Sequence, residues 1–167
     1  MKLTKGFEQA VCILVLLSTQ DSQAPLTSDA INSRLQVSPS YLKKIMRKLV
    51  VKNIICSVPG NNGGFFLART PEKIRLLDVV EAMEGHISTY PNSGLIRSIF
   101  ENIRQTAAIR GEEILIDVFS EADKLWSEYL SKQTVADLLH RTLGRHELPY
   151  RNWNLLNQNF NYENGDE

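Results

Sequence analysis

The feature that most constrains the fold is the stretch of residues 30–71, which contains no Asp or Glu. It carries seven basic residues: Arg34, Lys43, Lys44, Arg47, Lys48, Lys52 and Arg69. The whole chain has equal numbers of basic and acidic residues, 19 of each. Residues 1–85 hold eleven bases and seven acids (net +4), whereas residues 86–167 hold eight and twelve (net −4). We therefore expect one basic surface suited to a polyanion, joined to an acidic, solvated remainder.

Two short helical patterns lie inside this stretch, with a turn between them. Thr27 or Ser28 can cap the first helix. Ser38 followed by Pro39 is typical of a helix start, which predicts a second helix over 39–51. The second helix has an apolar stripe of Leu42, Ile45, Met46 and Leu49 and a separate basic stripe of Lys43, Lys44, Arg47 and Lys48. This pattern predicts a helix-turn-helix.

A β-hairpin is predicted directly after the second helix. Residues 54–58 and 65–68 are β-branched and aromatic, and PGNNGG separates them. Gly and Asn tolerate positive φ and favour such a tip. A helix-turn-helix followed by a hairpin indicates a winged helix. The predicted fold is therefore mainly α with a small β-hairpin wing, followed by a long helix.

The remaining elements divide the chain into four parts. We expect a first helix over 6–18, apolar on most faces and so covered on most faces, and a helix over 76–84 that completes the head at 1–85. Residues 86–111 form a linker containing a short helical pattern at 95–104. Residues 112–144 form a long helix to 132 and a short one capped by Thr134. Residues 145–167 form a tail that docks in part through Trp153 and Leu155.

The long helix has apolar residues at spacings of three and four, as in a heptad repeat. Such a seam is suited to packing on a partner helix. An ordinary helix that packs on its own domain is the alternative. The predicted dimerisation residues are Leu115, Val118, Phe119, Ala122, Leu125, Trp126 and Tyr129.

Membrane, catalytic and metal functions find little support in the sequence. The one long apolar run, residues 10–17, is too short to cross a bilayer, which takes about 20 residues. We therefore expect a cytoplasmic protein without a membrane partner. The histidines at 86, 140 and 146 are not arranged with a nucleophile, and no phosphate-cradling motif occurs. We expect no enzyme activity, no cofactor and no metal site.

Several segments resemble the Rrf2 family of bacterial transcription regulators, the IscR-like winged-helix dimers. The similar segments are LTKGFEQAV, SPSYLKKIMRKL, NIICSVPGNNGGFFLART, PEKIRLLDVVEAMEG and VFSEADKLWSEYLSKQTVADLL. The resemblance implies a homodimer that binds a palindromic operator in double-stranded DNA, most often as a repressor. Many members hold an iron–sulfur cluster through three cysteines, but residues 86–112 contain none here. Many also have an arginine in the wing, where this chain has Pro59.

Together the pattern and the resemblance predict how DNA is bound. We expect the helix over 39–51 to enter the major groove, with Lys43 or Lys44 donating to guanine and Arg47, Lys48 and Lys52 binding phosphate. Hydroxyls and the wing tip add further contacts. The predicted DNA-binding residues are Thr27, Ser38, Pro39, Ser40, Tyr41, Lys43, Lys44, Arg47, Lys48, Lys52, Asn61, Asn62, Gly63 and Gly64.

Other functions and signals stay open at this stage. One alternative is a winged helix that binds only protein. Another is a thiol-based redox regulator that uses Cys56 on the wing or Cys12 in the first helix. A small-molecule or protein effector is a third route of regulation, and the sequence favours no particular residues for it.

Overall fold

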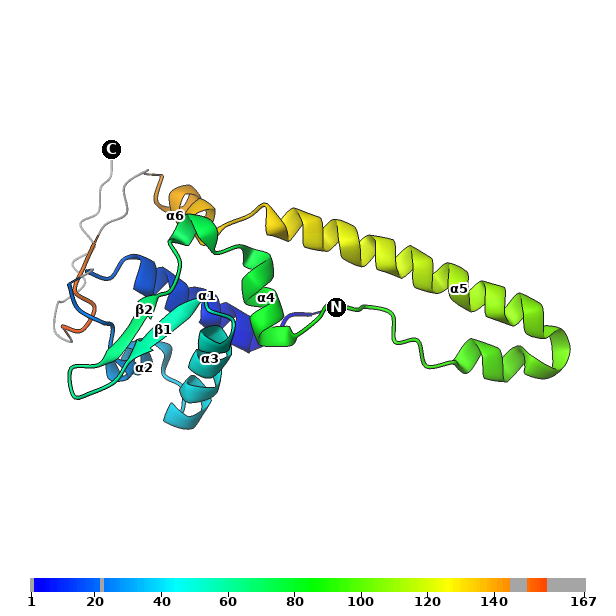
Figure 1. Cartoon of the computed structure of the whole chain (residues 1–167), viewed down its shortest axis with the longest axis horizontal. Coiled ribbons are helices and arrows are strands. Elements are labelled where there is room, and N and C mark those ends of the chain that lie inside the picture. The colour runs from blue at the N-terminus through cyan, green and yellow to red at the C-terminus, as the bar shows by residue number, and fades with distance from the viewer. Residues whose placement is uncertain (1, 22, 145–149, 156–167) are drawn as a thin grey trace.

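The structure is a computed structural model that describes residues 2–21, 23–144 and 150–155, apart from the side chains of 101–103. A head domain carries a helical arm that projects away from it (Figure 1). The elements are α1 (Lys5–Ser18), α2 (Ser28–Leu35), α3 (Pro39–Val51), β1 (Ile55–Val58), β2 (Gly64–Leu67), the 3-10 helix η1 (Pro71–Lys73), α4 (Leu76–Glu84), α5 (Leu95–Ser131) and α6 (Val135–Leu143). The predicted fold class, helical with a two-stranded wing, is confirmed.

The head is built around apolar side chains from α1, α3 and α4. Apolar residues at helical spacing turn one face of each helix inward, and the largest of these side chains are fully buried. From these helices they include Ile13, Leu14, Ile45, Leu49 and Val79, and Ile31 of α2 with Leu26, Ile54 and Ile74 of the connecting segments join the same core. This core fixes the position of α3 and leaves the opposite face of that helix exposed to solvent.

The wing is an antiparallel hairpin whose glycines are required by its close contacts. Its register pairs Ile55 with Leu67 and Val58 with Gly64. A Cβ on Gly63 would lie 2.2 Å from the Val58 carbonyl oxygen, and one on Gly64 would lie 2.4 Å from that of Leu26. Only glycine allows these approaches, which seat the wing against the segment that leads into α2.

The arm differs in its extent from the sequence prediction. The helical pattern predicted at 95–104 is present as the first segment of α5, which begins at Leu95, whereas the long segment starts just after Arg104 and not at the predicted residue 112. Arg104 has non-helical dihedral angles (φ −153°, ψ 71°) and kinks the helix. The short segment of α5 before the kink lies beside the start of the long segment after it (Figure 1). No single apolar stripe runs through this region and Gly111 is a poor helix former, which explains why the sequence pattern was weak.

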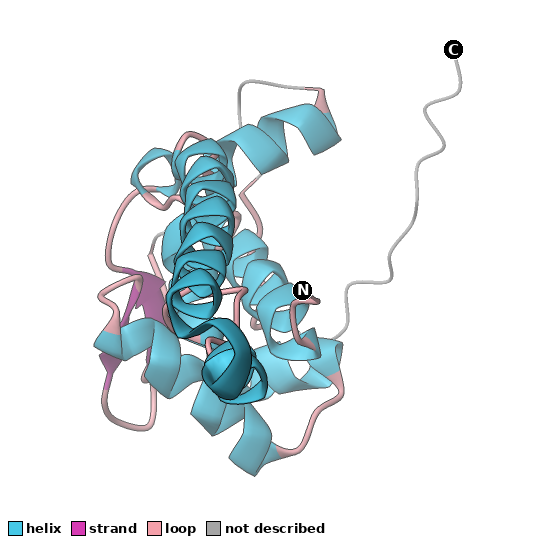
Figure 2. Cartoon of the chain, turned by 90° about the vertical axis from the view of Figure 1, so that its right-hand side faces the viewer, coloured by secondary structure: helices cyan, strands magenta, loops and turns pink. Residues whose placement is uncertain are grey.

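Three contacts hold the arm and its linker together. The backbone N–H and hydroxyl of Thr89 donate to Asp123 at 2.9 and 2.8 Å. The rings of Tyr90 and Phe119 stack at 5.5 Å between centroids. An ion pair joins Arg97 to Glu112, whose side chain is only 3% exposed. Seen from the side of α5, the head lies behind this helix (Figure 2).

The chain returns to the head through α6, which starts with a capping box. The Thr134 hydroxyl accepts from the Asp137 N–H at 3.1 Å, and Asp137 accepts in return from the Thr134 N–H at 2.8 Å. Backbone bonds from Leu76 to Gln133 (2.8 Å) and from Val135 to Ile74 (2.9 Å) fasten this corner beside η1 and α4. The C-terminal end of the arm is therefore anchored beside the start of α4.

A short segment near the C-terminus, residues 151–154, binds back onto the loop after α1; we call it the C-terminal clip. The Arg151 N–H donates to the Thr19 carbonyl (2.8 Å), and the Arg151 carbonyl accepts from the Asp21 N–H (2.9 Å). The Trp153 indole N–H donates to the Thr19 hydroxyl and its backbone N–H to the Gln20 side chain, both at 2.9 Å. The expected docking through Trp153 is therefore present.

Two expectations about burial were wrong. Leu155 is 53% exposed and does not dock. In α1, Cys12 is exposed, although the helix is apolar enough to have suggested cover on most faces. In the described part of the chain α1 packs against α2, α3, β2, α4 and α6, and Cys12 lies on the strip of the helix that these elements leave open. The remaining predicted tail positions, 145–149 and 156–167, lie outside the described residues.

Candidate nucleic-acid interface

One face of α3 is basic and open to solvent. Its apolar stripe is buried, with Leu42, Ile45, Met46 and Leu49 at most 3% exposed. Lys43, Lys44 and Arg47 are exposed on the other side, and Lys52 is exposed at the C-cap. Within the described ranges these four bases have no ion pair or side-chain hydrogen bond. They can therefore bind phosphate or base edges without first breaking an internal contact.

The start of α3 presents hydroxyl groups at the N-terminal end of the helix. The Ser38 hydroxyl oxygen accepts from the Tyr41 N–H at 3.3 Å and lies 3.3 Å from the Ser40 hydroxyl. A capping hydroxyl uses its oxygen and keeps its proton for another acceptor. Pro39, Ser40 and Tyr41 are exposed. Helix N-termini of this kind attract phosphate.

Three of the seven bases of the acid-free stretch serve the fold. Lys48 Nζ donates to the Met83 carbonyl at 2.5 Å, at the C-terminal end of α4, where the helix dipole favours a cation. Arg34 donates to the Ala30 carbonyl at 2.9 Å and stacks 5.0 Å from the Trp153 ring. The third, Arg69, ties the wing to α4. The sequence pattern alone did not distinguish Lys48 from the other bases of the basic stripe, so it was predicted to bind DNA with them.

The base of the wing is held by a network that sequence reasoning missed. Arg69 and Arg75 donate to opposite oxygens of Asp78 at 2.9 and 2.6 Å. Arg69 also donates to the Asn53 carbonyl at 3.0 Å, just before β1. Burial opposes the charge on Asp78, but the hydrogen bonds from Arg75 and Arg69 outweigh it and lower the pKa of Asp78 below its usual value. Asp78 at the N3 position of α4 was the available signal, because an acid there often completes a capping box.

The wing tip and the start of α2 flank an open hollow of about 430 Å³. Asn61 and Asn62 at the tip are exposed. The Gly63 N–H donates to the Gly60 carbonyl at 3.0 Å within the tip, so it is already used. The Thr27 hydroxyl accepts from the Ala30 N–H at 3.2 Å as the N-cap of α2. The glycines and Thr27 thus shape this edge of the surface, while the two asparagines face outward.

The predicted dimerisation residues form a partly exposed apolar stripe along α5. Val118, Leu125 and Tyr129 are 58%, 59% and 62% exposed. Ala122 is exposed as well, whereas Leu115 and Trp126 are half-buried. Phe119 is 39% exposed and stacks on Tyr90. A projecting helix with this much open apolar surface is typical of a protein–protein contact.

The comparison with protein families matches residues 3–141 to the Rrf2 model, described as an iron-dependent transcriptional regulator. The residues of this chain do not fit an iron–sulfur cluster, because such clusters are held by cysteine thiolates. The sequence has two cysteines, Cys12 in α1 and Cys56 in β1. Both are exposed, and the part of the chain that the structure describes holds no cluster of three His, Cys, Asp or Glu suited to a metal ion. In the same part, no helix is both long and apolar enough to span a membrane.

Individual relatives agree with the family match. YwgB of Bacillus subtilis strain 168, named as an HTH-type transcriptional regulator, is 43% identical over 143 residues, which cover 84% of this chain and 86% of that protein. A crystal structure of a transcriptional regulator from Lactobacillus plantarum superposes with a TM-score of 0.62 at 23% identity, covering 84% and 91% of the two chains. CymR, the global cysteine regulator of B. subtilis, gives a TM-score of 0.56 at 18% identity, covering 83% and 95%. The two structures support the fold, and the family match extends over most of the chain: it belongs to the Rrf2 family of transcriptional regulators, which bind DNA and are not enzymes.

Proposed function

We propose that this chain acts in the cytoplasm as a homodimeric repressor that binds a palindromic operator without an iron–sulfur cluster. The observation that carries the proposal is a set of four exposed bases, Lys43, Lys44, Arg47 and Lys52, which form no ion pair or side-chain hydrogen bond with any residue that the structure describes. A base that makes no contact inside the protein gains the full benefit of a phosphate contact.

The recognition helix in this proposal is α3. Its N-terminal residues Ser38 and Ser40, with Tyr41, approach base edges and phosphates, and Lys43 or Lys44 donates to guanine. Arg47 and Lys52 bind the backbone further along. Lys48 is assigned a structural role, because its ammonium group already binds the Met83 carbonyl.

The wing adds contacts of a different kind. Asn61 and Asn62 lie at the exposed tip and can hydrogen-bond the backbone or the minor groove. Pro59 supplies no charge there, so the wing contributes less to affinity than α3 does.

Dimerisation through α5 would pair two such heads. The exposed stripe of Val118, Leu125 and Tyr129 gives each arm an apolar face that a second arm can cover. In this layout residues 1–85 read DNA, 86–111 connect, and 112–144 dimerise. Two related heads explain why the operator should be palindromic.

The test is a mobility shift with DNA from upstream of the chain's own gene, followed by footprinting. A protected palindrome, and loss of the shift with Lys44→Glu plus Arg47→Glu in a protein that stays folded and dimeric, are expected. The matched control is Lys124→Glu plus Lys132→Glu, two exposed bases on α5 and at its C-cap. Equal loss in both double variants would contradict the assignment of α3. A reporter gene under the protected promoter should rise in expression when the regulator is deleted; a fall would make it an activator.

A further inference from the structure

The C-terminal clip does more than cover the α1–α2 loop, because it contacts the start of the helix-turn-helix. Asn154 Oδ1 accepts from the Thr27 backbone N–H at 2.9 Å, and Asn154 Nδ2 donates to the Pro25 carbonyl at 2.9 Å. Thr27 is the N-cap of α2. In the last turn of α2, Arg34 lies over the Trp153 ring, a cation–π contact. The clip therefore holds both ends of α2.

A cavity of about 420 Å³ lies between the clip, α1 and α6. Val11 and Val15 line it from α1, and Leu139 and Leu143 line it from α6. The clip closes the remaining side with Arg151 and Trp153. A mostly apolar concavity of this size with a few polar groups at its edge is the usual form of a small-molecule site.

The polar edge of the cavity favours a negatively charged ligand. Within the described ranges Arg151 makes no ion pair, although both of its backbone groups are bonded. A guanidinium group with free donors binds carboxylate in a bidentate fashion. A dry cavity of about 150 Å³ accommodates benzene, so this one has room for roughly ten to fifteen non-hydrogen atoms.

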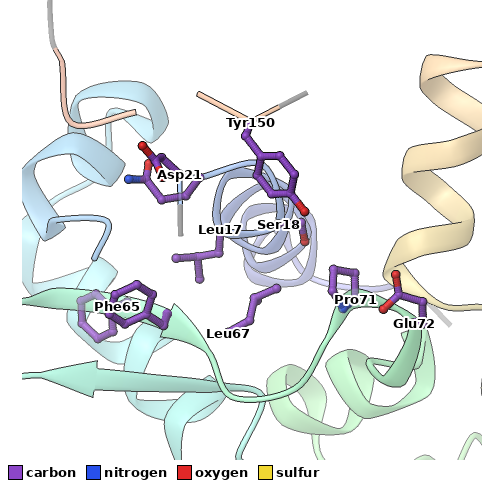
Figure 3. A pocket seen from close by; sticks show the side chains of 10 residues that line it. Leu17, Ser18, Asp21, Phe65, Leu67, Pro71, Glu72 and Tyr150 are labelled. Carbon is purple, nitrogen blue, oxygen red and sulfur yellow. The ribbon is translucent and has the colours of Figure 1, made fainter. Parts of the chain in front are cut away.

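A second cavity near the clip differs from the first in its size and in the charge of its lining residues. It measures about 240 Å³ and lies between the end of α1, β2 and η1, with Tyr150 above it (Figure 3). Asp21 and Glu72 stand at its edges. The Glu72 carboxyl, which accepts from its own backbone N–H and from Thr70, has a lowered pKa and stays ionised. This smaller, acidic cavity disfavours an anion, so of the two cavities the one between α1, α6 and the clip is the better suited to an organic anion.

We propose that the cavity between α1, α6 and the clip binds an apolar organic carboxylate, with its hydrocarbon part among Val15, Leu139 and Trp153 and its carboxylate on Arg151. Such a ligand touches three elements at once and stabilises the docked clip. The docked clip in turn fixes α2 through Thr27 and Arg34. By linkage, a ligand that favours the docked clip raises affinity for DNA. Only this last, regulatory clause rests on the proposed function.

Binding itself is tested without DNA, by calorimetry on the full-length protein with 4-phenylbutyrate and its amine counterpart 4-phenylbutylamine. The carboxylate should bind at least about tenfold more tightly than the amine, because only it can pair with Arg151. Arg151→Gln should weaken carboxylate binding about tenfold. Val15→Phe should abolish binding by filling the cavity, and Thr142→Trp at the more exposed rim does the same if Val15→Phe fails to fold.

Two matched controls keep the result specific. Arg141→Gln removes an exposed base of α6 that does not line the cavity, and Glu72→Gln alters the other cavity. Neither should change carboxylate binding. The proposal is overturned if no carboxylate binds, if the amine binds as well, or if Arg151→Gln and the filling variant bind normally. It is overturned also if binding appears only in a monomeric variant, since a second copy then occupies the cavity.

The regulatory clause is tested separately with the footprinted operator. Saturating 4-phenylbutyrate should raise the affinity of the wild-type protein for the operator by about fivefold or more. It should leave the affinity of the Arg151→Gln variant for the operator unchanged. Carboxylate binding with unchanged operator affinity would refute the coupling. A protein that binds the carboxylate and no DNA at all would refute the proposed function and leave the site standing.

Discussion

The salt dependence of operator binding follows from the number of free bases on α3. Each head presents four, Lys43, Lys44, Arg47 and Lys52, because Lys48 is engaged with α4. A dimer in which all of them neutralise phosphate charge, including the lysine that also donates to guanine, releases counterions from about eight phosphates, which gives a slope of log K against log salt of about −7. Between about 50 and 200 mM salt, affinity should fall roughly 20,000-fold.

Lys44→Ala plus Arg47→Ala removes half of these contacts. The slope should then be about −3.6, and the same change in salt should cost only about 150-fold in affinity. Fluorescence anisotropy with a labelled operator at five or more salt concentrations measures both slopes. Lys124→Ala plus Lys132→Ala makes the same change in net charge on α5 and should leave the slope unaltered.

Lys48→Ala separates contact with DNA from support of the fold. It should change the slope by less than about one while lowering the free energy of unfolding, since a charge-assisted bond to the Met83 carbonyl is lost. A wild-type slope shallower than about −2 would refute the assignment of α3 as the phosphate-binding surface. So would equal slopes in the α3 and α5 double variants.

Three further predictions concern the fold and the arm. The lowered pKa of Asp78 means that its contribution to stability is present above its unfolded pKa of about 3.9 and is lost as pH falls through its folded pKa. Asp78→Asn should therefore lower the free energy of unfolding by about 2 kcal/mol at pH 7 and make that free energy depend less on acid pH. Urea denaturation at pH 7 and at a pH below that unfolded pKa measures both effects. Gly64→Ala should lower the free energy of unfolding by about 2 to 3 kcal/mol, because the new Cβ meets the Leu26 carbonyl. Gly111→Ala lies in a helix interior where the new Cβ meets nothing, so it should raise the free energy of unfolding by about 1 kcal/mol. Equal effects of the two substitutions would contradict the packing argument. Val118→Asp should yield monomers in sedimentation analysis with an unchanged head, and a dimer of normal strength would remove α5 as the interface.

The head could be predicted from local sequence because each of its elements is signalled locally. Ser38-Pro39 marks the start of α3 in both the sequence and the structure, and the glycine-rich tip marks the turn between β1 and β2. The apolar and basic stripes of α3 fall on opposite faces as their spacing requires. The DNA-facing bases could therefore be named, although their contacts with DNA stay a prediction.

Interactions across long sequence separations could not be predicted in this way. Nothing near Lys48 in the sequence indicates that the Met83 carbonyl lies beside it. The same holds for the clip, because Trp153 and Thr19 are brought together only by the folded chain. The kink at Arg104 has no proline to announce it, and the ion pair between Arg97 and Glu112 forms only once the arm has folded back.

The seating of Asn154 against Thr27 also bears on how the protein is made. During synthesis the exposed bases of α3 leave the ribosome long before residues 151–154 do. The nascent chain therefore carries these bases while α2, the helix before them, still lacks its contacts with the clip. A product of premature termination after α6 would keep the bases of α3 and never gain those contacts on α2.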